Sequence, residues 1–547
     1  MGSDVKVFNE WWRNAVIYQV YPRSFFDTNG DGDGDLKGVI EQLPYLKGLG
    51  IDAIWLSPFY TTPNKDGGYD VSDPRDVDPK FGNLNDARQL INDAHAVGLK
   101  VIFDIVPNHF SSEHIWFKEA LASEPGSKER ARFHFRDGRG TDGSNPPNNW
   151  NSLFNGPSWS RVIEKNGKEG QWYLHLFDSS QPDLNWDNPE VAEDFDKTLR
   201  FWLDMGLDGF RIDVAHGMAK ASLDQDHRDP DGLTEALRID TGTMDRDRMI
   251  NLLSDIPFFG QDGVHDIYRE WHKIFASYPG DRMTVAEAYL YPTTRLADFV
   301  RPDELSQVFN FDYMFADWNA EAIKESISRT ISELGEVGAT PSWVMCNHDS
   351  PRVVSRLGVR ASRAFAGLTH ALPGSLYIYQ GEELGLPTGE IPDSARRDPA
   401  FIRSGGKDKG RDGARVPLPW KKSAHAFGFT SGAPWLPQMS AYGDLAVDVQ
   451  NADDSSYLNF YKKNLILRKK YSDFDVNAPL SFIDAPDGVV AFKRGQSILV
   501  ATNTTKDGKN VALDASYEII QDSAGESKID GNSLVIASES TVWVHAK

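Results

Sequence analysis

Residues 208–214, DGFRIDV, place an arginine and an aspartate two positions apart in an otherwise apolar run. Side chains at positions i and i+2 of a β-strand point to the same face, so we expect Arg211 and Asp213 to lie side by side. A neighbouring cation stabilises a buried carboxylate and favours its ionised form. An ionised, oriented carboxylate at a strand end can serve as a nucleophile. Taken alone, this spacing fits a structural ion pair equally well.

Two further apolar segments deliver a carboxylate at or just after their C-terminal ends. Glu287 follows the run at 283–286, and Asp349 follows the run at 343–346. Acidic residues at the ends of several parallel strands are typical of a (β/α)₈-barrel active site. Glu287 lies between two alanines with no adjacent cation in the sequence, so we expect its pKa to rise on burial, as a general acid requires.

The composition restricts the classes of partner. The chain has 547 residues, 40% of them hydrophobic, which predicts a soluble globular protein of two or three domains. Its 58 basic and 80 acidic residues give a net charge of −22, so neither nucleic acid nor a membrane surface is an expected partner. The single cysteine, Cys346, excludes an intramolecular disulfide. The N-terminus lacks a signal-peptide pattern and no apolar run approaches roughly 18 to 20 residues, so we expect a cytoplasmic protein.

Strand-like and helix-like segments alternate along most of the chain. We expect strands at 15–21, 51–56, 99–106, 207–212, 283–286, 307–310, 342–346 and 375–379. We expect helices at 36–49, 85–97, 189–205, 264–277, 316–334 and 457–471. Eight strands in alternation with helices predict an α/β fold, a parallel (β/α)₈ (TIM) barrel.

Two stretches depart from this alternation. Residues 107–173 are rich in Asn, Gly, Ser, Pro and Trp, which predicts a folded inserted subdomain after the third strand. Residues 473–547 contain short alternating runs separated by turns, which predicts a C-terminal antiparallel β-domain, a β-sandwich. The barrel is therefore expected to comprise residues 1–106 and 174–472.

The order and spacing of four motifs resemble glycoside hydrolase family 13, the α-amylase family. These motifs are DIVPNH at 104–109, GFRIDV at 209–214, VAEA at 285–288 and NHD at 347–349. Residues 181–185, QPDLN, resemble a fifth family motif in its oligo-1,6-glucosidase form. The resemblance implies that Asp213 is the nucleophile, Glu287 the acid/base and Asp349 a transition-state stabiliser in a retaining mechanism.

The same resemblance implies substrate contacts around the −1 subsite, the pocket for the sugar that is released. Tyr69 would stack on the glucose, and Asp66 with Arg411 would close its far side and make the enzyme exo-acting. Gly67 stands where the family usually has asparagine. Valine at position 214 is similar to the members that prefer α-1,6 bonds. The other implied substrate-binding residues are His109, Phe154, Phe177, Arg211, His348 and Arg415.

The loop at 27–35, DTNGDGDGD, offers an oxygen ligand at every second position, which suits Ca²⁺ or Mg²⁺. It is not an EF-hand, because its twelfth position would be Gly38. By resemblance to oligo-1,6-glucosidases the loop would hold a structural metal. The ligands would be the side chains of Asp27, Asn29, Asp31 and Asp35 and the carbonyl of Asp33. A solvated acidic turn is the alternative.

The resemblance implies an exo-acting retaining α-glucosidase that cleaves short α-linked oligosaccharides and prefers α-1,6 bonds, as in isomaltose and panose. It would act without an organic cofactor, as a monomer or weak homo-oligomer. One alternative is a maltase that prefers α-1,4 bonds. Another is a glucosyl-transferring relative of the sucrose isomerase or trehalose synthase type, in which a sugar instead of water attacks the glucosyl-enzyme. A catalytically silent relative, like the heavy chain of amino-acid transporters, is disfavoured because all three carboxylates are present.

Overall fold

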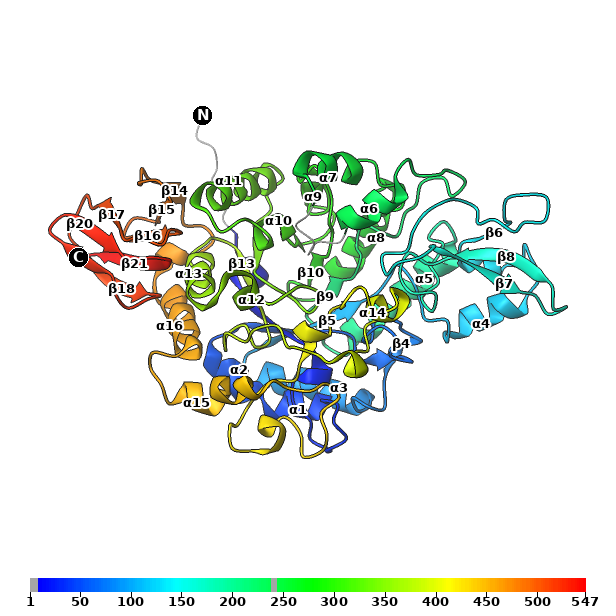
Figure 1. Cartoon of the computed structure of the whole chain (residues 1–547), viewed down its shortest axis with the longest axis horizontal. Helices are drawn as coiled ribbons and strands as arrows, with labels where there is room; N and C mark the ends of the chain where they lie inside the picture. Colours follow the sequence, from blue (N-terminus) through cyan, green and yellow to red (C-terminus); the bar gives the residue numbers. More distant parts are fainter. Residues whose placement is uncertain (1–7, 238–243) are drawn as a thin grey trace.

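The computed structural model describes residues 8–237 and 244–547. Eight parallel strands form one sheet in the order β11-β10-β9-β5-β2-β1-β13-β12, which curls into the barrel at the centre of Figure 1. Its edge strands β11 and β12 meet where the Ser342 hydroxyl donates to the Val308 carbonyl, at 2.5 Å. The strands are β1 (Val16–Val20), β2 (Ala53–Leu56), β5 (Lys100–Ile105), β9 (Gly209–Ile212), β10 (Met283–Ala286), β11 (Gln307–Val308), β12 (Ser342–Val344) and β13 (Ser375–Tyr379). The predicted barrel fold is confirmed.

Helices surround this barrel (Figure 1). The longer ones are α3 (Leu84–Ala96), α5 (Pro189–Asp204), α8 (Gly263–Ala276), α11 (Ala320–Glu336), α13 (Val359–Thr369) and α16 (Tyr457–Lys470). The shorter ones are α1 (Leu36–Glu41), α2 (Leu43–Leu49), α4 (Ile115–Ala122), α6 (Pro230–Leu237), α7 (Arg246–Leu253), α9 (Thr294–Asp298), α10 (Phe311–Met314), α12 (Val353–Leu357), α14 (Pro399–Arg403) and α15 (Val447–Asn451). The side chain of Asn188 caps α5 by accepting from the Glu190 backbone N–H, and Pro189 occupies the first turn.

Several predicted elements differ from the observed ones at their ends, and in three of them the local cause is visible. The single helix expected at 36–49 was wrong: α1 and α2 are separate, because Pro44 cannot donate within a helix and disfavours helical backbone before it. The strand expected at 307–310 ends at Val308, since Asn310 caps α10. The helix expected from residue 316 begins at Ala320, after the cap Asn319.

The segment between β5 and α5 carries α4 and a three-stranded antiparallel sheet, coloured cyan at the right of Figure 1. Its strands are β6 (Phe135–Arg136), β7 (Trp159–Ile163) and β8 (Glu169–Leu174), in the order β6-β8-β7. Trp150 and Trp159 are buried within this segment. An isolated bridge between His109 and Asp183 joins its two ends above the barrel. A shorter hairpin, β3 (Tyr60–Thr61) and β4 (Asp73–Val77), follows β2.

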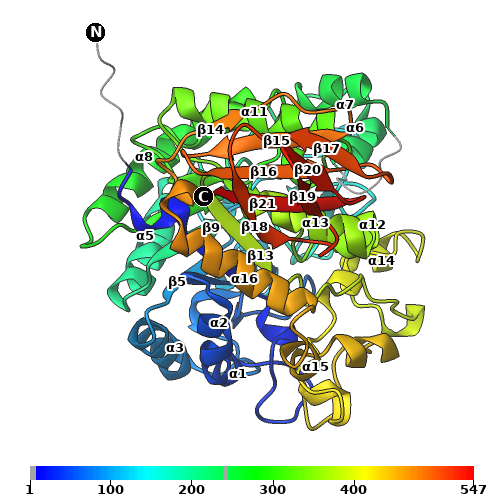
Figure 2. The ribbon, with the colours of Figure 1, turned by 90° about the vertical axis from the view of Figure 1, so that its left-hand side faces the viewer.

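The C-terminal strands form two antiparallel sheets, which face the viewer in Figure 2. One has the order β14 (Leu480–Phe482), β15 (Val489–Arg494), β16 (Ile498–Asn503), β21 (Ser540–Ala546) and β18 (Tyr517–Asp522). The other has the order β17 (Lys509–Ala512), β20 (Ser533–Ile536) and β19 (Lys528–Asp530). The indole of Trp543 is fully buried and donates to the Gly367 carbonyl of α13 at 2.9 Å. This contact fastens the larger sheet to the barrel.

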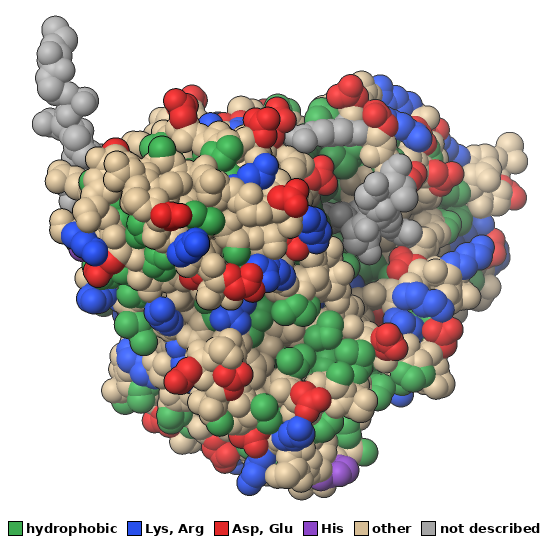
Figure 3. Space-filling model, turned by 60° about the vertical axis from the view of Figure 1, so that its left-hand side comes forward, with side chains coloured by type: hydrophobic (Ala, Val, Ile, Leu, Met, Phe, Trp, Pro, Cys, Tyr) green, Lys and Arg blue, Asp and Glu red, His purple; other side chains and the backbone are tan. Residues whose placement is uncertain are grey.

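Acidic and basic side chains are interspersed over the face shown in Figure 3, with apolar groups between them. No helix in the described part of the chain is both long and apolar enough to cross a membrane.

Candidate active site

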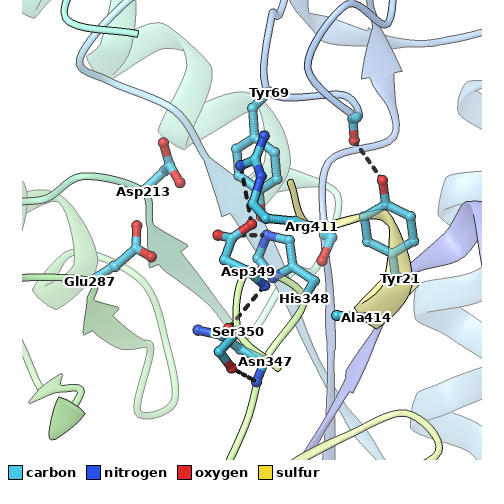
Figure 4. A network of polar contacts seen from close by, with 12 residues as sticks. Tyr21, Tyr69, Asp213, Glu287, Asn347, His348, Asp349, Ser350, Arg411 and Ala414 are labelled. Carbon is cyan, nitrogen blue, oxygen red and sulfur yellow. Dashed lines mark hydrogen bonds and ion pairs between the residues drawn. The ribbon is translucent and has the colours of Figure 1, made fainter. Parts of the chain in front are cut away.

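The three predicted catalytic carboxylates gather at the C-terminal ends of the barrel strands. Asp213 directly follows β9, Glu287 directly follows β10 and Asp349 lies in the loop after β12. Figure 4 shows Asp213 and Glu287 beside each other, across from Asp349. This is the end of a (β/α)₈ barrel at which active sites are built.

One guanidinium holds the acidic half of this site together. Arg211 is 1% exposed, and its Nη1 lies 2.7 Å from Asp213 Oδ1 and 2.8 Å from Asp104 Oδ1. Its Nη2 lies 2.7 Å from Glu287 Oε2. The expectation that Glu287 has no neighbouring cation was therefore wrong. The cation comes from the adjacent strand, since Val285 of β10 pairs with Arg211 of β9.

Burial raises the pKa of Asp213 above its usual range, although Arg211 opposes the shift. The like charges of Glu287 and Asp104 add to the increase. Burial also raises the pKa of Asp104 to about 7, again against Arg211. The expectation that Arg211 alone would keep Asp213 ionised is thus incomplete, because three carboxylates share its one positive charge.

Asp349 lies among two arginines instead. Its Oδ1 is 2.6 Å from Arg415 Nη2 and 3.2 Å from Arg411 Nη1. Burial alone would raise the pKa of Asp349, but His348 and the two guanidinium groups hold it well below its usual range. Arg411 Nη2 also lies 2.5 Å from Asp66 Oδ1, which joins the two residues expected to close the pocket.

Tyr69 and His348 form a stacked pair between these two halves. Their ring centroids are 5.2 Å apart with an interplanar angle of 9°, and the Tyr69 hydroxyl donates to Asp104 Oδ2 at 3.0 Å. Burial lowers the pKa of His348 to about 3, so its imidazole is neutral at neutral pH. Gln19 Nε2 lies 2.8 Å from His348 Nδ1, and an amide nitrogen can only donate, so the ring carries its proton on Nε2.

His109 is buried at the opposite edge, and burial lowers its pKa to about 4. Its Nε2 lies 3.1 Å from Gln181 Nε2, which also donates to Asp66 Oδ2 at 2.9 Å. The ring of His109 packs against Phe177 at 5.2 Å, and Phe177 in turn contacts Phe154. The residues expected around the −1 subsite are therefore connected through direct contacts.

The backbone turns sharply after Asp213. Val214 has a φ of +43°, a conformation that β-branched residues rarely adopt. The turn directs the Val214 backbone N–H to Glu287 Oε2 at 3.1 Å. A strained backbone conformation persists where surrounding contacts hold it, and here one such contact is the hydrogen bond to the Glu287 carboxylate.

Sequence reasoning missed Lys220, which is buried beneath the same turn. Its Nζ lies 2.9 Å from Asp183 Oδ2 and 2.8 Å from Asn108 Oδ1, and it also donates to the Gly217 carbonyl. Both side-chain partners belong to motifs noted in the sequence, but a lysine outside a motif gives no signal of this pairing. The buried ammonium joins the loop after β9 to both ends of the inserted segment.

A pocket of about 230 Å³ opens beside Glu287. Six of its lining residues were predicted: Phe154, Phe177, Val214, Glu287, Asp349 and Arg411. Sequence reasoning missed the rest of the wall, which includes Leu153, His216, Phe259, Tyr289, Phe311, Met314, Phe315, Asn347 and Ser350. The predicted nucleophile Asp213 and the other predicted substrate residues are not among those that line this pocket. Asp66, Arg211, Arg415 and His348 contact the lining residues Arg411, Glu287 and Asp349, His109 contacts Phe177, and Tyr69 stacks on His348.

The acidic loop at 27–35 lies between β1 and α1. Its side-chain oxygens accept hydrogen bonds from the loop itself: Asp27 from Gly30 N at 2.8 Å, and Asp35 from Thr28 N at 2.9 Å. Asp33 instead pairs with Arg23 at 2.5 Å. Within residues 8–237 and 244–547, no three His, Cys, Asp or Glu residues form a group that could hold a metal ion.

Residues 19–475 match the family model described as the α-amylase catalytic domain. The chain belongs to the α-amylase family. An oligo-1,6-glucosidase of Heyndrickxia coagulans is 35% identical over 91% of this chain and 93% of the relative. A trehalose-6-phosphate hydrolase of Escherichia coli (strain K12) is 36% identical over 91% of each chain. The solved structure of the α-glucosyl transfer enzyme XgtA is 35% identical, with a TM-score of 0.88 over 99% of this chain and 100% of the other.

We expect Lys220→Met to impair both stability and turnover. The substitution leaves the Asp183 carboxylate buried without its cation, a change that costs about 3–5 kcal/mol. Urea denaturation measures the loss, and kcat at a temperature where the variant is folded measures the effect on the site. Lys506→Met, which alters an exposed lysine of the C-terminal domain, is the control. An unchanged denaturation midpoint for Lys220→Met would contradict the bridging role.

Proposed function

We propose that this family member is an exo-acting, retaining α-glucosidase that releases glucose from the non-reducing end of short α-linked oligosaccharides. The observation that carries the proposal is the shared contact of Arg211 with Asp213 and Glu287, at distances of 2.7 Å each, beside a pocket closed by Asp66 and Arg411. The names of the oligo-1,6-glucosidase relatives support an α-glucosidic substrate.

The two carboxylates divide the chemistry between them. Asp213 attacks the anomeric carbon while Glu287 donates a proton to the glycosidic oxygen, and a glucosyl ester forms on Asp213. Glu287 then takes a proton from water, which attacks the same carbon and releases glucose with its α configuration retained. Arg211 and the Val214 N–H both contact Oε2 of Glu287, which leaves Oε1 for the glycosidic oxygen.

The −1 glucose would lie against Tyr69, with Asp349 and His348 at its hydroxyls. Arg411 and Arg415 keep Asp349 ionised, so it can stabilise positive charge that develops on the sugar ring. His348 Nε2 lies 3.3 Å from Asp349 Oδ2, so its proton can point to that carboxylate or to a sugar oxygen bound beside it. Asp66 and Arg411, with Phe154 under the Arg411 guanidinium at 4.7 Å, block extension beyond this glucose.

A glucosyl-transferring activity is the second candidate. The structural neighbours titled α-glucosyl transfer enzyme and trehalulose synthase favour it, because both cover essentially the whole chain at 30% identity or more. Hydrolysis and transfer use the same glucosyl-enzyme, and the acceptor that reaches Glu287 decides between them. A maltase that prefers α-1,4 bonds is the third, and differs only in the fit of the leaving sugar.

We further propose that the loop at 27–35 binds a structural cation, with Ca²⁺ or Mg²⁺ as the candidates. Its donor atoms are all oxygens, and Gly30 and Gly32 turn the backbone at positive φ between them, which fits a hard cation. The Asp33 side chain is paired with Arg23, in keeping with a carbonyl ligand at that position. We also propose that the protein is a cytoplasmic monomer or weak homo-oligomer. The buried free thiol of Cys346 suits a reducing compartment.

Asp213→Asn should lower kcat/KM on the order of 10⁴-fold or more without changing the melting temperature appreciably. Covalent catalysis needs the carboxylate, whereas the amide has nearly the same shape. Asp530→Asn, at an exposed position of the C-terminal domain, is the matched control. Substantial hydrolysis by Asp213→Asn with a normal melting curve would rule out its role as nucleophile.

The acid limb of kcat/KM should lie well above the usual aspartate pKa of about 3.9. Burial raises the pKa of Asp213, and the nucleophile must lose its proton before it attacks, so activity falls as the pH drops through this raised value. Asp104→Asn removes a neighbouring negative charge and should move the limb to lower pH. An acid limb at or below about pH 4 would contradict the raised pKa.

Isomaltose and panose should be cleaved faster than maltose, with starch nearly untouched. Val214 lines the pocket and offers the next sugar no hydrogen bond, which an α-1,6 bond with its extra rotatable carbon tolerates better. Val214→Thr should shift the ratio towards maltose, by no more than about 1–3 kcal/mol. Chromatography of parallel digests, with sucrose and trehalose included, measures the ratio, and Val97→Thr on the outer surface is the control. A wild-type preference for maltose of about tenfold or more would refute this specificity.

Chelation should lower the melting temperature more than it lowers activity at 25 °C. An ion that binds only the native state stabilises that state by mass action, so its removal lowers the melting temperature. The loop contains no catalytic carboxylate, so activity should change less. Asp31→Ala should abolish the chelator effect, whereas Asp142→Ala, which removes a similar aspartate from an exposed turn, should not. Loss of activity on chelation with an unchanged melting curve would contradict a structural metal.

A further inference from the structure

We propose that Asp398 fixes Arg411 in the contact with Asp66 that closes the pocket, and that this anchor makes the site reject a terminal glucose that is extended at its far side. This proposal rests on the proposed function, because it requires Asp66 and Arg411 to enclose the non-reducing glucose. The side chain of Asp398 is fully buried and does not line the pocket, so it would act through Arg411. Asp398 is therefore a positioning residue for specificity.

Each nitrogen of the Arg411 guanidinium contacts a different carboxylate. Nη2 lies 2.5 Å from Asp66 and Nη1 lies 3.2 Å from Asp349, and both of these carboxylates belong to the site. Nε lies 2.6 Å from Asp398 Oδ2, and the Arg411 backbone N–H donates to the same oxygen at 2.9 Å. Because the guanidinium is planar and presents its donors in a rigid fork, a contact that holds Nε also sets the direction of both Nη groups. Asp398 thus orients the edge of Arg411 that faces the sugar.

Asp398 is itself held in place on two sides. Its Oδ1 accepts from the Ala400 backbone N–H at 2.8 Å and so caps α14. Gly410 passes close to it with a φ of +61°, and a Cβ at that position would lie 2.6 Å from the Cβ of Asp398. Burial alone would raise the pKa of Asp398, but Arg411 and Arg415 hold it below its usual range. The anchor is therefore both fixed in position and ionised at neutral pH.

The other end of α14 supports the same guanidinium on its face. Arg403, the last residue of the helix, donates from Nε to the Asn155 carbonyl of the inserted segment at 3.0 Å. The ring of the preceding residue, Phe154, lies 4.7 Å from the central carbon of the Arg411 guanidinium. Helix α14 therefore holds the edge of Arg411 through Asp398 and its face through the loop that carries Phe154.

The test compares nitrophenyl α-glucoside with its derivative methylated on the O4 hydroxyl, which adds one methyl group at the far side of the glucose. The wild type should discriminate against the methyl group by about 100-fold in kcat/KM. Asp398→Asn should reduce this discrimination by about fivefold or more. The physical reason is that an amide has one acceptor oxygen, which cannot serve both the Ala400 N–H and the two N–H groups of Arg411.

Two further variants separate the anchor from a general effect on stability. Asp398→Ser keeps the helix cap, since serine caps helices as well as aspartate does, but its hydroxyl is too short to reach Arg411. It should reduce the discrimination as Asp398→Asn does, with a smaller change in melting temperature. Asp208→Asn is the matched control: this buried carboxylate accepts from the Val101 N–H and pairs with Lys100, each at 2.9 Å, at the opposite end of the barrel. It should lower the melting temperature and leave the discrimination unchanged.

Arg403→Met tests the other end of α14 with Asp398 in place, and should reduce the discrimination by about twofold or more. Wild-type discrimination in both Asp398→Asn and Asp398→Ser would overturn this proposal and leave the proposed function intact. Equal cleavage of the two glucosides by the wild type would show that the far side of the pocket is open, and would overturn the exo-acting mode together with this proposal.

Discussion

A single buried guanidinium, that of Arg211, determines the arrangement of the site. Its contacts to Asp104, Asp213 and Glu287 come from three adjacent strands, and the parallel register places Asp104 and Val285 directly beside it. Because burial of unpaired carboxylates is strongly unfavourable, these strands could not keep their acids here without that cation. The strand order β10-β9-β5 therefore brings the three carboxylates to Arg211 as well as forming part of the barrel.

The two halves of the site shift carboxyl pKa values in opposite directions. Around Arg211, three carboxylates face one cation, and burial raises the pKa of Asp213 and Asp104. Asp349 instead contacts two guanidinium groups, those of Arg411 and Arg415, and its pKa is held well below its usual range. Arg411 also pairs with Asp66 and Asp398. When their environments shift carboxyl pKa values in opposite directions, one site can contain both a group that transfers protons and a group that stays charged. The proposed nucleophile, Asp213, lies in the first half and the proposed stabiliser, Asp349, in the second.

The sequence predicts what depends on local pattern and on motif order. Eight apolar segments in alternation with helices were enough for the barrel, and spacing within one strand was enough for the pairing of Arg211 with Asp213. Contacts between strands were not predictable in the same way: the cation beside Glu287 lies 76 positions away along the chain, and was missed. Lys220, His216 and the aromatic wall lie outside the motifs, and only the fold brings them to the site.

The turn at Val214 links the two catalytic strands into one unit. Its strained φ of +43° directs one N–H to the Glu287 carboxylate, and the next N–H, that of Ala215, donates to the Glu287 carbonyl at 2.8 Å. Lys220 holds the same loop from below through the Gly217 carbonyl. A strained backbone conformation persists only where surrounding contacts hold it. These contacts therefore indicate that the backbone, as well as Arg211, fixes the position of Glu287 relative to Asp213. Val214 therefore affects both the linkage preference and the geometry of the acid/base, because its side chain lines the pocket and its backbone N–H orients Glu287.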